Sequence, residues 1–182
     1  YYIYKNIPGV INNIKTVIGA SGGALVGLGI VLKYTEEELK DLSVEIGYEK
    51  LTNLDITKFF SKMGLDNGKN VIKFIKLIVK AKLGNENATF SDLYNYNNVK
   101  YIVVSTCIDT FETEYFSYDN VPNMCIWKAI RMSLSLPFMF TPVKYKGKTY
   151  IDGALADYFP LQTLDTFITD ENINDRVIGI RL

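Results

Sequence analysis

Residues 15–23 have the sequence Lys-Thr-Val-Ile-Gly-Ala-Ser-Gly-Gly, and this stretch decides the fold. Residues 15–19 are rich in β-branched and apolar side chains and predict a short buried strand that runs into glycine. Residues 22–34 continue as an apolar segment of helical length. A strand, a tight turn that carries a serine, and a helix together predict a nucleophile elbow, in which the turn lifts the hydroxyl of Ser21 clear of a sheet.

The glycines around Ser21 have separate predicted roles. We expect Gly19 and Gly23 to be glycine because the strand and the helix pass too close to each other for side chains. The start of a helix directs unpaired N–H groups and the positive end of the helix dipole at its surroundings. The N–H of Gly22, directly after the serine, is therefore the candidate donor to an oxyanion.

The chain contains no histidine, which restricts what Ser21 can do. A serine hydroxyl is a poor nucleophile until a base takes its proton, and the usual base is an imidazole. Either Ser21 is not a nucleophile, or its base is another side chain. Asp152 is the best-placed candidate, because it ends a predicted strand and is followed by Gly153 on a turn, where functional groups often lie. The hypothesis is a Ser21–Asp152 dyad.

Two other interpretations of the glycine turn stand beside this hypothesis. In one, Ser21 merely caps the following helix through its side chain. In the other, the turn belongs to a dinucleotide-binding fold, which requires an acidic residue at the end of a second strand about 20 positions on. That region is an acidic helix here, beginning with a capping box of Thr35 and Glu38. Tyr96 and Lys100 have a dehydrogenase spacing, but they lie outside a helical pattern, so we interpret this match as chance.

The remaining pattern alternates helices and strands. Helices are predicted at 35–47, 55–64, 70–83, 123–134 and from Pro160 onward, with one or two helical turns at 89–95. Strands are predicted at 100–107, 113–117, 143–145, 149–151 and 176–181, and the two around Lys146-Gly147-Lys148 form a hairpin. This order predicts an α/β three-layer sandwich with a mostly parallel central sheet and helices on both faces.

Composition excludes several classes of function. The 182 residues are the length of one domain, and 20 basic residues balance 20 acidic ones, which argues against a nucleic-acid binder. Without histidine, a zinc or other transition-metal site is not expected, and two cysteines are too few for a disulfide framework. We find no signal peptide and no apolar stretch that could span a bilayer, so we expect an intracellular protein, cytoplasmic or peripheral to membranes.

One helix carries a stripe of lysines at helical spacing, formed by Lys69, Lys73, Lys76 and Lys80. It could lie on an anionic membrane with its apolar face in the interface. We favour the other interpretation, in which the apolar face packs in the core and the lysines face solvent or the acidic helix that begins at Thr35.

A second block of sequence, Trp127 to Pro142 followed by Tyr150-Ile-Asp-Gly-Ala-Leu-Ala-Asp-Tyr-Phe-Pro160, resembles the second catalytic block of patatin-like phospholipases. The stretch from Ile18 to Gly27 is similar to the serine elbow of that family. The resemblance runs from about Thr16 to Leu182 and implies a patatin-like catalytic domain over residues 1–182. It further implies Ser21 as nucleophile, Asp152 as base, no cofactor, and hydrolysis of acyl esters in phospholipids or related lipids through an acyl-enzyme. A lipid substrate implies transient contact with a membrane surface.

The chain departs from the family pattern in three places. A glycine-rich oxyanion loop, which the family carries on its first strand, does not occur before Thr16, and we expect it to precede Tyr1. Ala154 replaces the second glycine of the Asp-Gly-Gly motif, and Tyr158 replaces a frequent asparagine. Arg131 matches a frequent family arginine that could brace a carboxylate, meet lipid phosphate or form a surface ion pair. The alternative function is a degenerate patatin fold that serves as a non-catalytic lipid-binding or structural module.

Overall fold

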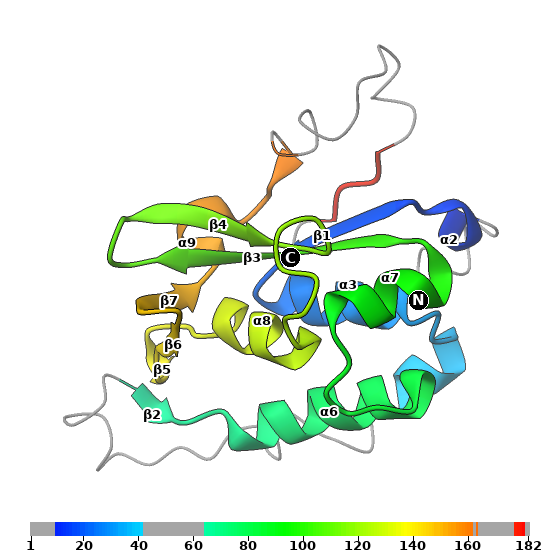
Figure 1. The fold of residues 1–182 in the computed structure, drawn as a ribbon, viewed down its shortest axis with the longest axis horizontal. Coiled ribbons are helices and arrows are strands. Elements are labelled where there is room, and N and C mark those ends of the chain that lie inside the picture. Colours follow the sequence, from blue (N-terminus) through cyan, green and yellow to red (C-terminus); the bar gives the residue numbers. More distant parts are fainter. Residues whose placement is uncertain (1–9, 42–63, 162, 164–176, 181–182) are drawn as a thin grey trace.

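A computed structural model describes residues 10–41, 64–161, 163 and 177–180 (Figure 1). The predicted helices at 55–64 and after Pro160 lie largely outside these residues, and the one at 35–47 is described only as far as residue 41. Residues 36–41, 161 and 163 are helical. The predicted capping box is present, since the Thr35 N–H donates to Glu38 Oε2 at 2.7 Å and the Glu38 N–H donates to Thr35 Oγ1 at 3.2 Å.

The main sheet is mixed, with β3 at its centre. Its strands are β1 (Thr16–Ala20), β3 (Lys100–Cys107), β4 (Glu112–Phe116), β6 (Val143–Tyr145) and β7 (Lys148–Asp152). Strand β1 runs parallel to β3, whereas β4 and β7 run antiparallel to β3 and β6 runs antiparallel to β7. The prediction of a mostly parallel sheet is therefore wrong.

Short connections explain this orientation. Four residues join β3 to β4, and the pair Lys146-Gly147, with φ of 48° and 81°, joins β6 to β7 as the predicted hairpin. Connections of this length can join only antiparallel strands, because a parallel crossover needs a dozen residues or more. A separate small sheet pairs β2 (Gly64–Asp66) with β5 (Phe138–Phe140) in parallel.

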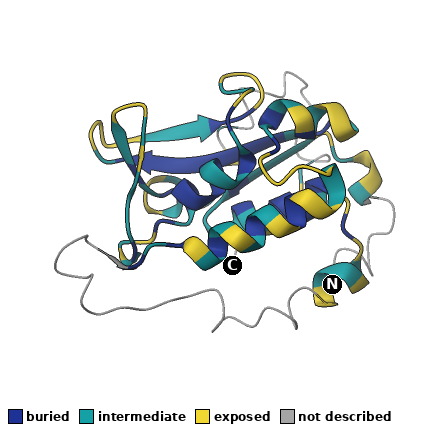
Figure 2. Cartoon of the chain, turned by 60° about the horizontal axis from the view of Figure 1, so that its bottom comes forward, coloured by how far each residue is buried: buried dark blue, intermediate teal, exposed yellow. Residues whose placement is uncertain are grey.

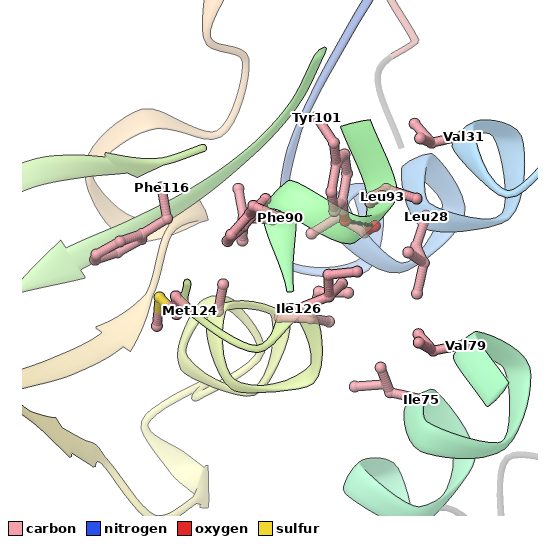
Figure 3. Close-up of a cluster of buried hydrophobic side chains, with 14 of the residues drawn as sticks. Leu28, Val31, Ile75, Val79, Phe90, Leu93, Tyr101, Phe116, Met124 and Ile126 are labelled. Carbon is pink, nitrogen blue, oxygen red and sulfur yellow. Dashed lines mark hydrogen bonds between the residues drawn. The ribbon is translucent and has the colours of Figure 1, made fainter. Parts of the chain in front are cut away.

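The longer helices of the described residues gather below the sheet in the view of Figure 1. They are α3 (Gly22–Val31), α6 (Lys69–Leu83), α7 (Phe90–Asn97) and α8 (Ile126–Ser133). The short helices α2 (Val10–Asn13) and α9 (Ala154–Asp157) lie outside this group. Helices α3, α7 and α8 contact β3, and α6 packs on α7 and α8. The core lies between them, built from the buried side chains that Figure 3 labels, among them Leu28, Ile75, Phe90 and Ile126.

Both faces of β3 are buried. Tyr101 and Val103 alternate with Ile102 and Val104 along the strand, so the two pairs point to opposite faces, and all four are buried. The three-layer prediction requires that both faces of the central sheet are covered, and the burial of these four side chains agrees with this requirement. The helix on the second face stays a prediction.

The lysine-striped helix α6 packs as we favoured. Its apolar positions Val71, Ile75, Ile78 and Val79 are buried in the core. Lys82 at its C-terminal end bonds Glu38 at 2.8 Å, so the acidic segment pairs with α6. Figure 2 shows the exposed residues of this long helix on its outer side.

One predicted strand is absent from the described residues. Residues 177–180 were expected within a strand at 176–181, but they are described and have no strand pairing. Ile178 and Ile180 remain about half exposed, at 49% and 52%. The apolar alternation was therefore no guarantee of a partner strand, because a strand needs a neighbour to receive its backbone hydrogen bonds.

Candidate active site

Ser21 occupies a strained backbone position between β1 and α3. Its φ of 51° and ψ of −125° lie in a region that non-glycine residues rarely adopt, at a cost of about 1–3 kcal/mol. The Ser21 side chain makes no capping hydrogen bond to α3. The capping interpretation is therefore wrong, and the hydroxyl points elsewhere.

The glycines of the turn differ in how much room each would leave for a side chain. A Cβ on Gly19 would lie 2.5 Å from the carbonyl oxygen of Gly23, so the strand and the helix approach as predicted. A Cβ on Gly22 or Gly23 would meet nothing within 4 Å. The prediction that Gly23 lacks room for a side chain is wrong. Only its backbone is close to Gly19, and its own Cβ direction is open.

Strand β3 brings Ser21 and Asp152 together through its register. Ala20, directly before Ser21, pairs with Val104, and Asp152 pairs with Ser105. Strands β1 and β7 therefore end at consecutive residues of β3, on the same edge. Their two ends meet there although 131 residues separate them along the chain.

The two candidate side chains are in hydrogen-bond contact. Ser21 Oγ donates to Asp152 Oδ2 at 2.6 Å, and the Ala154 N–H donates to Asp152 Oδ1 at 2.9 Å. Asp152 is only 1% exposed. Gly153 is required at its position, because a Cβ there would overlap the Val104 carbonyl group.

Burial sets the electrostatics of Asp152. Loss of solvent raises the pKa of its carboxyl above the ordinary aspartate value, while the hydrogen bonds from Ser21 and from the Ala154 N–H act in the opposite direction. The net effect is a raised pKa. A carboxylate with a raised pKa is a stronger base than a free aspartate, which suits it to accept a proton from a hydroxyl.

The end of α8 holds both candidate residues, and sequence reasoning missed it. The Ser21 N–H donates to Ser133 Oγ at 2.8 Å. The Gly153 N–H donates to the Ser133 carbonyl at 3.3 Å, and the Asp152 N–H donates to the Ser135 carbonyl at 3.0 Å. The only available signal was the Ser-Leu-Ser sequence before Pro137, which by itself predicts no contact.

Arg131 anchors this end of α8 from the interior. It is 2% exposed, and it donates to Ser135 Oγ at 2.6 Å and to the Thr141 carbonyl at 2.9 Å. Burial lowers the pKa of Arg131 to about 10, against the opposing effect of the Asp66 charge. The Asp66 charge acts on Arg131, but the roles of bracing a carboxylate and of meeting lipid phosphate stay predictions. A surface ion pair is excluded by the burial.

Two candidate groups remain, the Gly22 N–H next to Ser21 and the side chain of Tyr158 after α9. The N–H of Gly22 is one of the first in α3 and has no intrahelical acceptor, and a Cβ on Gly22 would meet nothing within 4 Å. Tyr158 is 61% exposed at the end of α9. Within the described ranges, no three His, Cys, Asp or Glu side chains converge as metal ligands. No helix in those ranges has the length and apolarity needed to cross a membrane.

The structure thus defines the general class, an α/β protein with a serine elbow beside a buried carboxylate. The model of the patatin-like phospholipase family matches residues 4–165, and the chain belongs to that family. It is 30% identical over 172 residues to an uncharacterized protein of Acanthamoeba polyphaga mimivirus, covering 93% of this chain and 54% of the relative. It is 28% identical over 156 residues to a protein of Invertebrate iridescent virus 6 named "Probable lipid hydrolase 463L", covering 83% of this chain and 53% of the relative.

A solved structure shares the fold. VipD from Legionella pneumophila matches with a TM-score of 0.53 and 17% identity, over 81% of this chain and 41% of that one. The chain spans about half the length of the curated relatives it matches, at 54% and 53%.

Proposed function

We propose that this chain is a serine acyl hydrolase that cleaves ester bonds of phospholipids or related lipids through Ser21 and Asp152. One observation carries the proposal, the 2.6 Å hydrogen bond from Ser21 Oγ to Asp152 Oδ2 in a chain without histidine. Membership of the patatin-like phospholipase family and the name of the viral relative support a lipid as the substrate class.

The first half of the reaction transfers the acyl group to Ser21. Asp152 Oδ2 takes the hydroxyl proton as Ser21 Oγ attacks the ester carbonyl, and the carbonyl oxygen becomes an oxyanion. The Gly22 N–H, at the positive end of α3, donates to that oxyanion. As the tetrahedral intermediate collapses, Asp152 returns the proton to the leaving alcohol, and an ester to Ser21 remains.

The second half of the reaction hydrolyses this ester. Asp152 takes a proton from a water molecule, whose oxygen attacks the acyl carbonyl. Collapse of the second intermediate releases the fatty acid, and the proton on Asp152 goes back to Ser21 Oγ. The burial that raises the pKa of Asp152 favours both proton transfers, because it makes the carboxylate a better acceptor near neutral pH.

The test measures the fluorescent product that the natural protein releases from a fluorogenic phospholipid. Ser21→Ala and Asp152→Asn should each abolish hydrolysis, and Cys107→Ala, a buried change on β3 outside the dyad, is the control for folding. Activity that survives in either dyad variant would refute the mechanism.

A fluorophosphonate probe separates the enzyme from the alternative, a non-catalytic lipid-binding module. Labelling at Ser21 in the wild type, lost in Ser21→Ala, supports an enzyme whatever its natural lipid. Lipid binding without labelling supports the module. That residues 1–182 form one catalytic domain stays a prediction.

A further inference from the structure

A buried hydroxyl lies beside the dyad and has no part in the reaction as derived above. Ser105 on β3 is 0% exposed, and among the described residues its Oγ has no hydrogen-bond partner. An unpaired buried hydroxyl is unfavourable, so a native chain that keeps one calls for a reason.

The sheet register places Ser105 next to Asp152. The two residues are direct partners in the antiparallel pairing of β3 with β7. The Ile108 N–H bonds the Thr149 carbonyl, and hydrogen-bonded pairs alternate along a ladder, so the pair of Ser105 and Asp152 is of the non-hydrogen-bonded kind. In agreement, the Asp152 N–H donates to Ser135 instead. Side chains of such a pair share a face and approach closest, with Cβ atoms about 4.5–5.5 Å apart.

The need for another donor arises once Ser21 is acylated. In the resting state, Ser21 Oγ donates to Asp152 Oδ2 and the Ala154 N–H donates to Oδ1. In the acyl-enzyme, Ser21 Oγ is an ester oxygen with no proton. Asp152 Oδ2 then loses the hydroxyl that held it, at the stage when the carboxylate must stay ionised and aimed at water.

We propose that Ser105 is a positioning residue for the second half of the reaction, whose hydroxyl donates to the Asp152 carboxylate in the acyl-enzyme. The step requires the Ser105 side chain to turn toward Asp152, and no covalent bond forms or breaks. This inference rests on the proposed function. At rest, Ser21 is the side-chain donor to Asp152 Oδ2, and the Ser105 hydroxyl has no partner among the described residues.

The effect of Ser105 on the pKa of Asp152 can be measured in a pH profile. The ionisable side chains on the elements packed around it include Cys107 on β3, Arg131 on α8, Asp157 on α9 and Tyr150 on β7. Among the described residues, none of these contributes to the shift of the Asp152 pKa. Loss of a donor to the carboxylate raises its pKa in the acyl-enzyme, so the acid limb of kcat should move to higher pH.

The experiment compares wild type with Ser105→Ala in the natural protein, using a p-nitrophenyl ester in stopped flow and a fluorophosphonate probe. We expect kcat to fall roughly tenfold or more, as for loss of one hydrogen bond to a charged group, with a burst of product from accumulated acyl-enzyme. The rate of fluorophosphonate labelling, which reports only the attack by Ser21, should stay within twofold of wild type. Ser105→Thr, which keeps a hydroxyl, should restore kcat, and Cys107→Ala controls for a cavity on the same face of β3.

Three results would overturn the inference. The first is a Ser105→Ala variant with wild-type kcat and an unchanged pH profile. The second is a parallel loss of kcat and labelling, which would assign the hydroxyl to the attack step or to the fold. The third is a wild type that is neither labelled nor active, which would refute the proposed function itself and is distinguished from the other two by the wild-type measurement alone.

Discussion

Ser133→Ala tests whether the end of α8 holds the nucleophile in its strained conformation. The substitution removes the Oγ that accepts the Ser21 N–H at 2.8 Å, but it keeps the Ser133 carbonyl that accepts the Gly153 N–H. A backbone N–H left without its acceptor costs about 1–3 kcal/mol. If this whole free energy is added to the activation barrier, the rate at which Ser21 reacts falls by between about fivefold and about 150-fold. Because Ser21 is only partly buried, water can replace part of the bond, so we expect a loss of roughly 5–20-fold.

The assay is the second-order rate of fluorophosphonate labelling, with kcat/KM for a fluorogenic ester measured beside it. Ser117→Ala is the matched control, because the Ser117 hydroxyl is also buried and accepts a backbone N–H, from Asp119 at 3.2 Å, in the loop after β4. Both variants should lose similar stability, but only Ser133→Ala should lose reactivity. A Ser133→Ala protein that labels within twofold of wild type would refute the reasoning.

Two further predictions concern stability. Burial raises the pKa of Asp152 in the folded chain, so the folded state binds its proton more tightly and loses stability as pH rises from the unfolded pKa of about 3.9 through the folded pKa. Asp152→Asn should therefore raise Tm at pH 7. This gain in Tm should vanish below pH ~3.9, where the Asp152 carboxyl is protonated in both the folded and the unfolded chain. A gain in Tm that is the same at both pH values would contradict this account. Gly19→Ala should strongly lower Tm, because its Cβ would lie 2.5 Å from the Gly23 carbonyl oxygen. Gly23→Ala is the control and should fold normally, because a Cβ there would meet nothing within 4 Å. Equal melting temperatures for the two variants would show the elbow to be looser than described.

The local parts of the fold were predictable because they depend on nearby residues. The strand at 100–107 is the observed β3, and the hairpin around Lys146-Gly147 follows from the turn residues alone. The contact between Ser21 and Asp152 was predictable as a pairing of residue types, since a chain without histidine offers few bases for a serine. Sequence spacing could not give the distance between the two residues.

What escaped prediction depends on contacts between distant segments. The direction of β7 against β3 follows from how the chain returns to the sheet, which apolar alternation does not encode. Ser133 acts through a side chain at the end of a helix, and serines at helix ends are common without any such role. The burial of Arg131 depends on the Gly68 turn, where a Cβ would overlap the guanidinium, and no local pattern announces that approach.

The alignment of β7 on β3 also determines how this protein can fail. Side chains of a strand alternate between faces, so sliding β7 by a single position would turn Asp152 away from Ser21 and leave most of the backbone pairing of the sheet intact. Such a molecule would remain compact and would have nearly the same circular dichroism spectrum, yet it would be chemically inert. For this family member, spectroscopic evidence of folding is a weaker criterion of quality than titration of the reactive serine.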